Sequence, residues 1–242
     1  MRLFATAIFT LLSITSISNA ELPVELTESQ IKEGGKLLLL TIDAKDGDLY
    51  SRTELGRKYY YGDGAPQDYV EAVKWLRKAS SGVDGFHGDP FAQCLLGQCY
   101  YFGLGVPKDL VKAAKWYREA AEGGLADAQR ALGYMYKEGE GVPKDDVKAA
   151  KWNRKAAEQG DARAQRDLAI QYHVGKGVPE DYIKSYMWAN LAAALGDTLA
   201  PGLKDILIEK MTKEQIAEAQ KLSSEWFKKI KEQGNLQSIN SF

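Results

Sequence analysis

The stretch LGYMYKEGEGVPKDDVKAAKWNRKAA, residues 132–157, contains a pattern that recurs four times along the chain. Tryptophans mark the recurrence with spacings of 41, 36 and 36 residues, at Trp75, Trp116, Trp152 and Trp188. The same spacings separate four prolines, Pro66, Pro107, Pro143 and Pro179. A fixed period of about 20–50 residues is typical of repeat arrays. The sequence therefore predicts an array of four units.

Each copy predicts two helices joined by a loop. In the quoted copy, Leu132, Gly133 and Tyr136 share one face of the first helix, helix A. The small residue beside the leucine allows close approach of the next helix. Glycines such as Gly139 end helix A in the left-handed conformation. Asp145, two residues after the loop proline, is placed to cap the second helix, helix B.

Helix B carries a large ring between small residues. Ala149, Trp152 and Ala156 fall on one helical face, and the other copies repeat this spacing. A buried indole removes about 150–250 Å² from water. We therefore expect the four tryptophans to be the main organisers of the core.

The array has distinct segments at both ends. Residues 21–46 predict an N-terminal capping helix over 31–42, with a capping box at Thr27 and Gln30. Repeats are expected at 47–88, 89–124, 125–160 and 161–197, with an inserted loop at 80–88 in the first. Capping helices at 198–232 follow: Pro201-Gly202 is expected to break the chain before a short helix. Thr212 and Gln215 then begin an amphipathic helix, and 233–242 is expected to be a disordered tail.

The first twenty residues predict a signal peptide, residues 1–20. Arg2 gives a positive start, residues 3–17 are mostly apolar, and Ser18-Asn19-Ala20 suits cleavage after Ala20. A buried helix or a membrane anchor is the alternative, but a spanning helix needs about 20 apolar residues. We expect an exported protein, periplasmic or secreted, with no membrane span after cleavage.

The composition argues against several other classes. The 32 basic and 33 acidic residues nearly cancel, so nothing indicates a nucleic-acid-binding face. Cys94 and Cys99 are the only cysteines and lie on one predicted helix, about 140° apart around its axis. A disulfide between them would be strained, so two reduced thiols are expected.

The repeated phrase LGxxYxxGxGVPxDxxKAxxWxxxAA resembles the Sel-like repeat of the tetratricopeptide repeat superfamily, over residues 47–197. The helix with Met211-Thr212 and Trp226 resembles the closing segment of many such proteins. The resemblance implies an all-α fold, a right-handed α-solenoid of helix pairs with the A helices on its concave side. It also implies a scaffold for protein complexes with peptide or protein ligands. The paired cysteines of the family's cysteine-rich secreted branch are missing.

No catalytic or cofactor-binding motif was found. His87 and His173, the only histidines, lie in different repeats, and the sequence contains neither His-Glu-x-x-His nor Cys-x-x-Cys. Asp84, His87 and Asp89 could bind a metal loosely, but a solvated loop is the simpler interpretation. We expect no enzyme, no cofactor and no metal. The alternative is a cell-envelope protein that binds or cleaves glycans such as peptidoglycan, using tyrosines to stack on sugars and Glu138 as a carboxylate.

Partner binding is predicted on the concave surface. If the leucine of Leu-Gly is position 7 of helix A, positions 2, 5, 9, 12 and 13 lie opposite the packed side. Aromatic and arginine side chains there are typical binding hot spots. The predicted binding residues are Tyr50, Arg57, Tyr60, Tyr61, Phe91, Gln98, Tyr101, Phe102, Arg130, Tyr134, Lys137, Arg163, Arg166 and His173. The same positions hold Thr53, Cys94, Asp127, Glu138, Ile170 and Val174. Packing of the tyrosines at 60, 61 and 101 and of Phe102 against adjacent helices remains the alternative.

Overall fold

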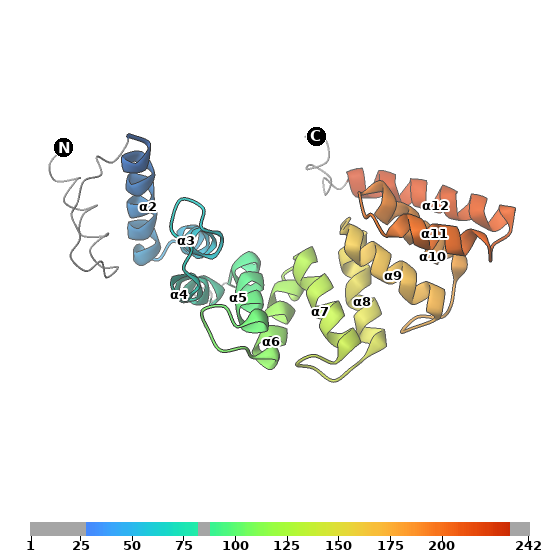
Figure 1. The fold of residues 1–242 in the computed structure, drawn as a ribbon, viewed down its shortest axis with the longest axis horizontal. Helices are drawn as coiled ribbons and strands as arrows, with labels where there is room; N and C mark the ends of the chain where they lie inside the picture. The colour runs from blue at the N-terminus through green and yellow to red at the C-terminus, as the bar shows by residue number, and fades with distance from the viewer. Residues whose placement is uncertain (1–27, 82–87, 233–242) are drawn as a thin grey trace. The chain divides into compact units, whose positions relative to one another are not determined.

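The computed structural model describes residues 28–81 and 88–232, and within these ranges it consists of eleven helices and no strand (Figure 1). This confirms the all-α prediction. The expected signal peptide, the tail, Thr27 of the first capping box and most of the insertion lie outside the described residues. The chain forms two compact units, Met1–Leu95 with Leu104–Val106, and Leu96–Gly103 with Pro107–Phe242.

The first unit begins with the capping helix. Helix α2 is longer than the predicted 31–42 and packs on α3, which in turn packs on α4. Ala44 of α2, Leu55 of α3 and Trp75 of α4 belong to one buried cluster. The three helices are α2 (Glu28–Asp46), α3 (Leu49–Tyr61) and α4 (Tyr69–Ser80). Helix α5 (Pro90–Phe102) contributes residues to both units.

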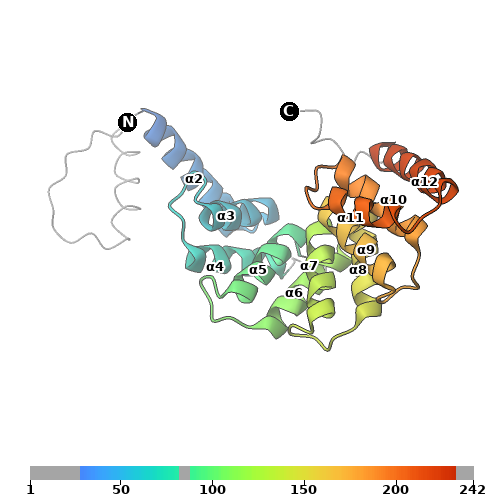
Figure 2. The ribbon, with the colours of Figure 1, turned by 45° about the vertical axis from the view of Figure 1, so that its right-hand side comes forward.

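In the second unit, each helix from α6 to α10 packs on the next one along the chain. Helices α11 and α12 both pack on α10, and Figure 2 shows these three together near the C-terminal end. The helices are α6 (Leu110–Glu122), α7 (Ala126–Glu138), α8 (Asp146–Glu158), α9 (Ala162–Val174), α10 (Tyr182–Ala194), α11 (Ala200–Ile208) and α12 (Lys213–Glu232).

The predicted helix ends are confirmed. Gly139 ends α7 with φ of 79°, a left-handed conformation that a side chain would strain. Asp145 then accepts a hydrogen bond from the Lys148 N–H at 2.9 Å and caps α8. Asp68, Asp109 and Asp181 cap the other B helices in the same way.

The small residue of helix A allows the close approach that was predicted. A Cβ on Gly56 would lie 2.6 Å from Leu76, and one on Gly133 would lie 2.3 Å from Asn153 Oδ1. Both distances are shorter than those that real Cβ atoms keep from neighbouring atoms, so a side chain here would force its neighbour to move. In each case the residue that follows the repeat tryptophan therefore packs directly on the backbone of helix A.

The prediction that all four tryptophans are core residues is wrong for two of them. Trp75 and Trp188 are only 4% and 3% exposed, whereas Trp116 and Trp152 are half-buried. The physical reason lies in the ends of the array. Trp75 shares a cluster with residues of α2, and the Trp188 ring lies 5.4 Å from that of Trp226 in α12. Lysine ammonium groups lie over the half-buried rings, 5.8 Å away at Trp116 and 4.4 Å at Trp152.

The C-terminal capping region contains one correction. Pro201 and Gly202 do not break the chain; they lie in the first turn of α11, where proline needs no hydrogen-bond donor. The second capping box is confirmed. Gln215 accepts a hydrogen bond from the Thr212 N–H at 2.9 Å, and Thr212 Oγ1 accepts one from the Gln215 N–H at 3.2 Å.

Candidate partner-binding surface

The A helices are α3, α5, α7 and α9, and we call positions 2, 5, 9, 12 and 13 of each its helix-A face. On α3 this face ends in two adjacent tyrosines. The Tyr60 ring makes edge-to-face contacts with Tyr61 at 4.9 Å and with Tyr69 of α4 at 5.4 Å. Tyr61 is 53% exposed and Tyr50, at the start of the helix, is 71% exposed. Tyr60 therefore packs locally, while its two neighbours on the face reach solvent.

Arg57, also on the face of α3, is held by two carboxylates. Its Nε lies 3.1 Å from Glu54 Oε2, and its Nη2 lies 3.0 Å from Asp63 Oδ2 in the following loop. These carboxylates raise the pKa of Arg57 even though its partial burial acts in the opposite direction. The guanidinium is therefore engaged by two carboxylates of its own repeat.

In the second unit, α5 ends in the matching aromatic pair. The rings of Tyr101 and Phe102 meet edge to face at 4.8 Å, and the Tyr101 hydroxyl donates to Glu140 Oε2 at 2.6 Å. Burial, and then the Glu140 carboxylate, raise the pKa of Tyr101 well above its ordinary value. Phe102 is 63% exposed and Tyr134 of α7 is 44% exposed. We call Tyr101, Phe102 and Tyr134 the aromatic cluster; Tyr101 is anchored, and the other two present apolar surface to solvent.

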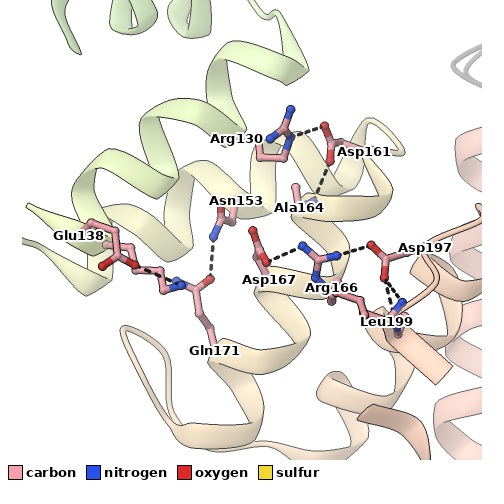
Figure 3. Close-up of polar contacts among 12 residues, drawn as sticks. Arg130, Glu138, Asn153, Asp161, Ala164, Arg166, Asp167, Gln171, Asp197 and Leu199 are labelled. Carbon is pink, nitrogen blue, oxygen red and sulfur yellow. Dashed lines mark hydrogen bonds and ion pairs between the residues drawn. The ribbon is translucent and has the colours of Figure 1, made fainter. Parts of the chain in front are cut away.

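The arginines of α7 and α9 make contacts within the array. Arg130 Nε donates to Asp161 Oδ2 at 3.0 Å, and the other Asp161 oxygen accepts from the Ala164 N–H at 2.7 Å to cap α9 (Figure 3). Arg130 also pairs with Asp127 at 3.1 Å. Each of these contacts ties the A helix of repeat three to itself or to the start of repeat four.

One repeat later the same arrangement recurs. Arg166 Nη1 lies 2.6 Å from Asp197 Oδ2, and Asp197 Oδ1 accepts from the N–H groups of Leu199 and Ala200 at the start of α11 (Figure 3). The Asp197 side chain is only 4% exposed. Arg166 also lies 3.3 Å from Asp167, whose pKa is raised by burial against the opposing pull of this arginine. The two arginines thus connect the A helices of repeats three and four to the N-termini of α9 and α11, respectively.

Position 5 does not belong to the open surface in the first two repeats. Thr53 and Cys94 occupy it and are 6% and 4% exposed, so their placement among the surface positions was wrong. Arg130 and Arg166 show the reason, since they occupy position 5 and reach the aspartates that cap the next helices, α9 and α11. A short side chain at this position is therefore covered.

The other predicted residues are spread along the same faces. Lys137 pairs with Glu138 at 3.4 Å, and Arg163 is exposed. The half-buried His173 ring lies 5.8 Å from Tyr182. On α5, Phe91 is 37% exposed and Gln98 is half-buried.

The described residues offer little reactive chemistry. No group of three or more His, Cys, Asp or Glu in residues 28–81 and 88–232 is arranged to hold a metal ion. Cys94 and Cys99 are free and buried, and burial raises the pKa of the Cys99 thiol to about 12, which keeps it protonated. None of the described helices combines the length and apolar content needed to cross a membrane.

Paired helices with this loop, cap and glycine pattern define a helix-pair repeat protein. A family model described as "Sel1 repeat" matches residues 50–84, 90–125, 126–161 and 162–197. The chain belongs to the Sel1 repeat family, whose members generally act as scaffolds for protein interactions. A search of curated proteins gave no match.

Solved structures give the same classification. The chain is 34% identical to c5321, a protective antigen of uropathogenic Escherichia coli strains, over 82% of this chain and 41% of that one, with a TM-score of 0.69. It is 35% identical to a Sel1 repeat protein from Oxalobacter formigenes, over 72% of this chain and 49% of that one, with a TM-score of 0.63. The chain thus spans less than half the length of either relative.

Proposed function

We propose that this protein is an exported, non-catalytic scaffold that captures a protein or peptide partner on its helix-A faces. The observation that carries the proposal is the exposure of aromatic side chains there: Phe102 is 63% and Tyr134 is 44% exposed. Aromatic residues dominate protein-binding hot spots. The Arg–Asp contacts of α7 and α9 fix these two A helices against the helices that follow, so the Tyr134 ring of α7 is presented on a preorganised surface.

The proposal is tested by capture from cell-envelope extract, scored by mass spectrometry for bound proteins and for peptidoglycan fragments. We expect the wild-type protein to retain a specific protein and the double variant Phe102→Ala/Tyr134→Ala to lose it. The matched control is Val111→Ala/Val147→Ala, which removes side chains that are 68% and 66% exposed on the B helices. Equal capture by both double variants would contradict the assignment of the face, and retention of peptidoglycan alone would favour the glycan-binding alternative.

Export is proposed from the residue pattern of segment 1–20. Mass spectrometry of the protein recovered from the envelope fraction should find Glu21 as its first residue. A chain that keeps Met1 and stays in the cytoplasm would contradict it.

A further inference from the structure

Helix α2, the first helix that the structure describes, has apolar residues on two opposite sides. Ala44 belongs to the buried cluster of the first unit, and Leu37 and Leu40 pack against it. On the other side of the helix, Leu39 and Ile42 are 64% and 45% exposed. A helix that ends a repeat array needs a polar outer face to stay soluble. The exposed aliphatic side of α2 therefore points to a further contact.

Helix α12, at the C-terminal end of the array, has the polar outer face that α2 lacks. Its exposed residues are all charged or polar except Ala217. Its large apolar residues are buried or half-buried, namely Ile216, Leu222, Trp226, Phe227 and Ile230. Apolar exposure is therefore a property of α2 and is not shared by the helix that closes the array.

The outward residues of α2 form a continuous stripe. Positions spaced alternately by three and four residues share one face of a helix, and on α2 they hold Lys32, Gly35, Leu39, Ile42 and Asp46. We call these five residues the α2 stripe. A Cβ built on Gly35 would meet no atom within 4 Å, so the helix backbone is open to a neighbour there. The same spacing marks the seam along which two helices pack in a coiled coil.

Charge divides the α2 stripe and its border into two halves. Lys32 and Lys36 lie toward the N-terminus of the helix, whereas Asp43 and Asp46 lie toward its C-terminus, and all four are exposed. Leu39 stands between the two halves. A surface that binds this stripe must therefore be apolar at its centre, acidic at one end and basic at the other.

The remaining charges of α2 leave this division intact. Glu33 pairs with Lys36 at 2.6 Å, but 60% of the lysine side chain is exposed, and such a surface pair contributes little. Lys45 lies about 120° around the helix from Leu39, which places it off the stripe.

A second copy of α2, running antiparallel, has the required pattern. If the two helices cross at Leu39, the basic half of each stripe lies against the acidic half of the other, and opposite charges attract. Leu39 and Ile42 of both copies then cover one another. In this register Glu28 is placed beyond the end of the partner helix, which stops at Asp46. A parallel pair would instead set like charges side by side.

We propose that the protein forms an antiparallel homodimer through the α2 stripe. The contact is isologous, so it closes at two copies. One helix from each copy gives an interface at the small end of the specific range, so the dimer is weak, with a Kd on the order of 10 μM. The dimer carries two sets of helix-A faces, which favours a partner that offers two binding sites. The inference rests on α2 alone and stands or falls independently of the proposed function.

Sedimentation equilibrium of the purified full chain, over a range from about 1 to 200 μM, tests the dimer directly. The mean mass should rise with concentration from that of one chain toward that of two and no further. Added salt should weaken the association, because it screens the charges of the stripe. The mass of one chain at every concentration would overturn the inference, since the stripe would then be covered by the chain itself or by another protein. Masses beyond two chains would overturn it too, because an isologous contact cannot propagate.

Leu39→Glu provides the first variant. It places two carboxylates at the crossing point and should weaken dimerisation at least about tenfold. The matched control is Val70→Glu in α4, because Val70 is also 64% exposed and lies in the same unit. Both variants should keep the helical circular dichroism of the wild type, since both side chains reach solvent. Undiminished dimerisation of Leu39→Glu, or the same weakening in Val70→Glu, would contradict the assignment of the stripe.

A pair of charge-swap variants identifies the second copy as the occupant. Lys32→Glu/Lys36→Glu makes the whole stripe acidic, and Asp43→Lys/Asp46→Lys makes it basic. Both changes agree with the helix dipole, so α2 should stay folded in each. Each variant alone should remain monomeric, and an equal mixture of the two should form a heterodimer. A mixture that stays monomeric, or a single variant that still dimerises, would overturn the inference.

Discussion

The A helices of repeats one and two differ from those of repeats three and four in how they end. The first two end in aromatic pairs, Tyr60-Tyr61 and Tyr101-Phe102, and the last two end in Lys137-Glu138 and His173-Val174. At position 5 of helix A the larger side chains are instead found in the last two repeats. There the first two repeats have covered small residues, and the last two have arginines bound to Asp161 and Asp197, which cap α9 and α11.

This contrast separates two roles that the sequence pattern had merged. Arg130 and Arg166 lie at positions predicted to face a partner, yet their guanidinium groups bind the aspartates that cap α9 and α11. Phe102 and Tyr134 are more exposed, at 63% and 44%, and present apolar area to solvent. Arg130 and Arg166 therefore contribute to stability, and the exposed aromatic residues are available to a partner.

Both pairs of repeats rest on a core that includes the repeat tryptophans. Removing the most buried of these rings in the last two repeats should have the largest effect on stability. Trp188→Ala should lower the free energy of unfolding by about 3–5 kcal/mol, because a nearly buried indole leaves a large cavity. Trp152→Ala should cost about half of that, since its ring is only half-buried. Urea titration followed by circular dichroism measures the free energy of unfolding of both variants. Equal losses of stability would show that the C-terminal helix α12 does not bury Trp188 more deeply than Trp152.

The next effect concerns the arginine contacts. Arg166→Ala should lower the free energy of unfolding by about 2–3 kcal/mol, because it leaves the nearly buried Asp197 carboxylate without its countercharge. Arg163→Ala, three residues earlier, is the matched control and should change stability by less than about 0.5 kcal/mol. Arg163 is exposed and has no ion pair in the part of the chain that the structure describes. The same small change in both variants would make Arg166 a free surface group after all.

A smaller effect distinguishes the two aromatic residues at the end of α5. Tyr101→Phe should cost about 1 kcal/mol, because it removes the hydroxyl that donates to Glu140 at 2.6 Å. Phe102→Ala should leave thermal unfolding nearly unchanged, since its ring is 63% exposed. A larger loss at Phe102 than at Tyr101 would mean that Phe102 is a packing residue.

The smallest expected effect depends on pH. The folded state raises the pKa of Asp167 chiefly through burial, so folding disfavours its ionised form. The cost is fully present above the folded-state pKa, and it disappears as pH falls through that value and below the unfolded one, about 3.9. Asp167→Asn should therefore be slightly more stable than wild type at neutral pH, and the difference should shrink on acidification. A difference that grows as the pH falls would contradict the burial argument.

Much of the fold could be predicted because the residues that define each helix and loop recur at the same positions in every repeat. The period, the loop glycines and the caps such as Asp145 act locally, so each is readable from a short window. The burial of each tryptophan, in contrast, could not be predicted from its own repeat. Whether Trp75 or Trp152 is covered depends on helices outside its own repeat.

The arginine contacts were missed although the sequence contains a signal for them. Asp161 follows Arg130 by 31 residues, and Asp197 follows Arg166 by the same interval. Because the helix pairs stack in order, the residue at position 5 lies beside the aspartate that caps the helix about one repeat later. A spacing of 31 residues therefore predicts a contact between the two side chains.

The central claim is that binding and stability are carried by different residues on the same surface. The most direct measurement is the affinity of the captured partner for Phe102→Ala/Tyr134→Ala, taken together with its free energy of unfolding. We predict binding at least about tenfold weaker, with stability within about 1 kcal/mol of wild type. Unchanged affinity, or a loss of affinity that only follows a loss of folding, would contradict the account.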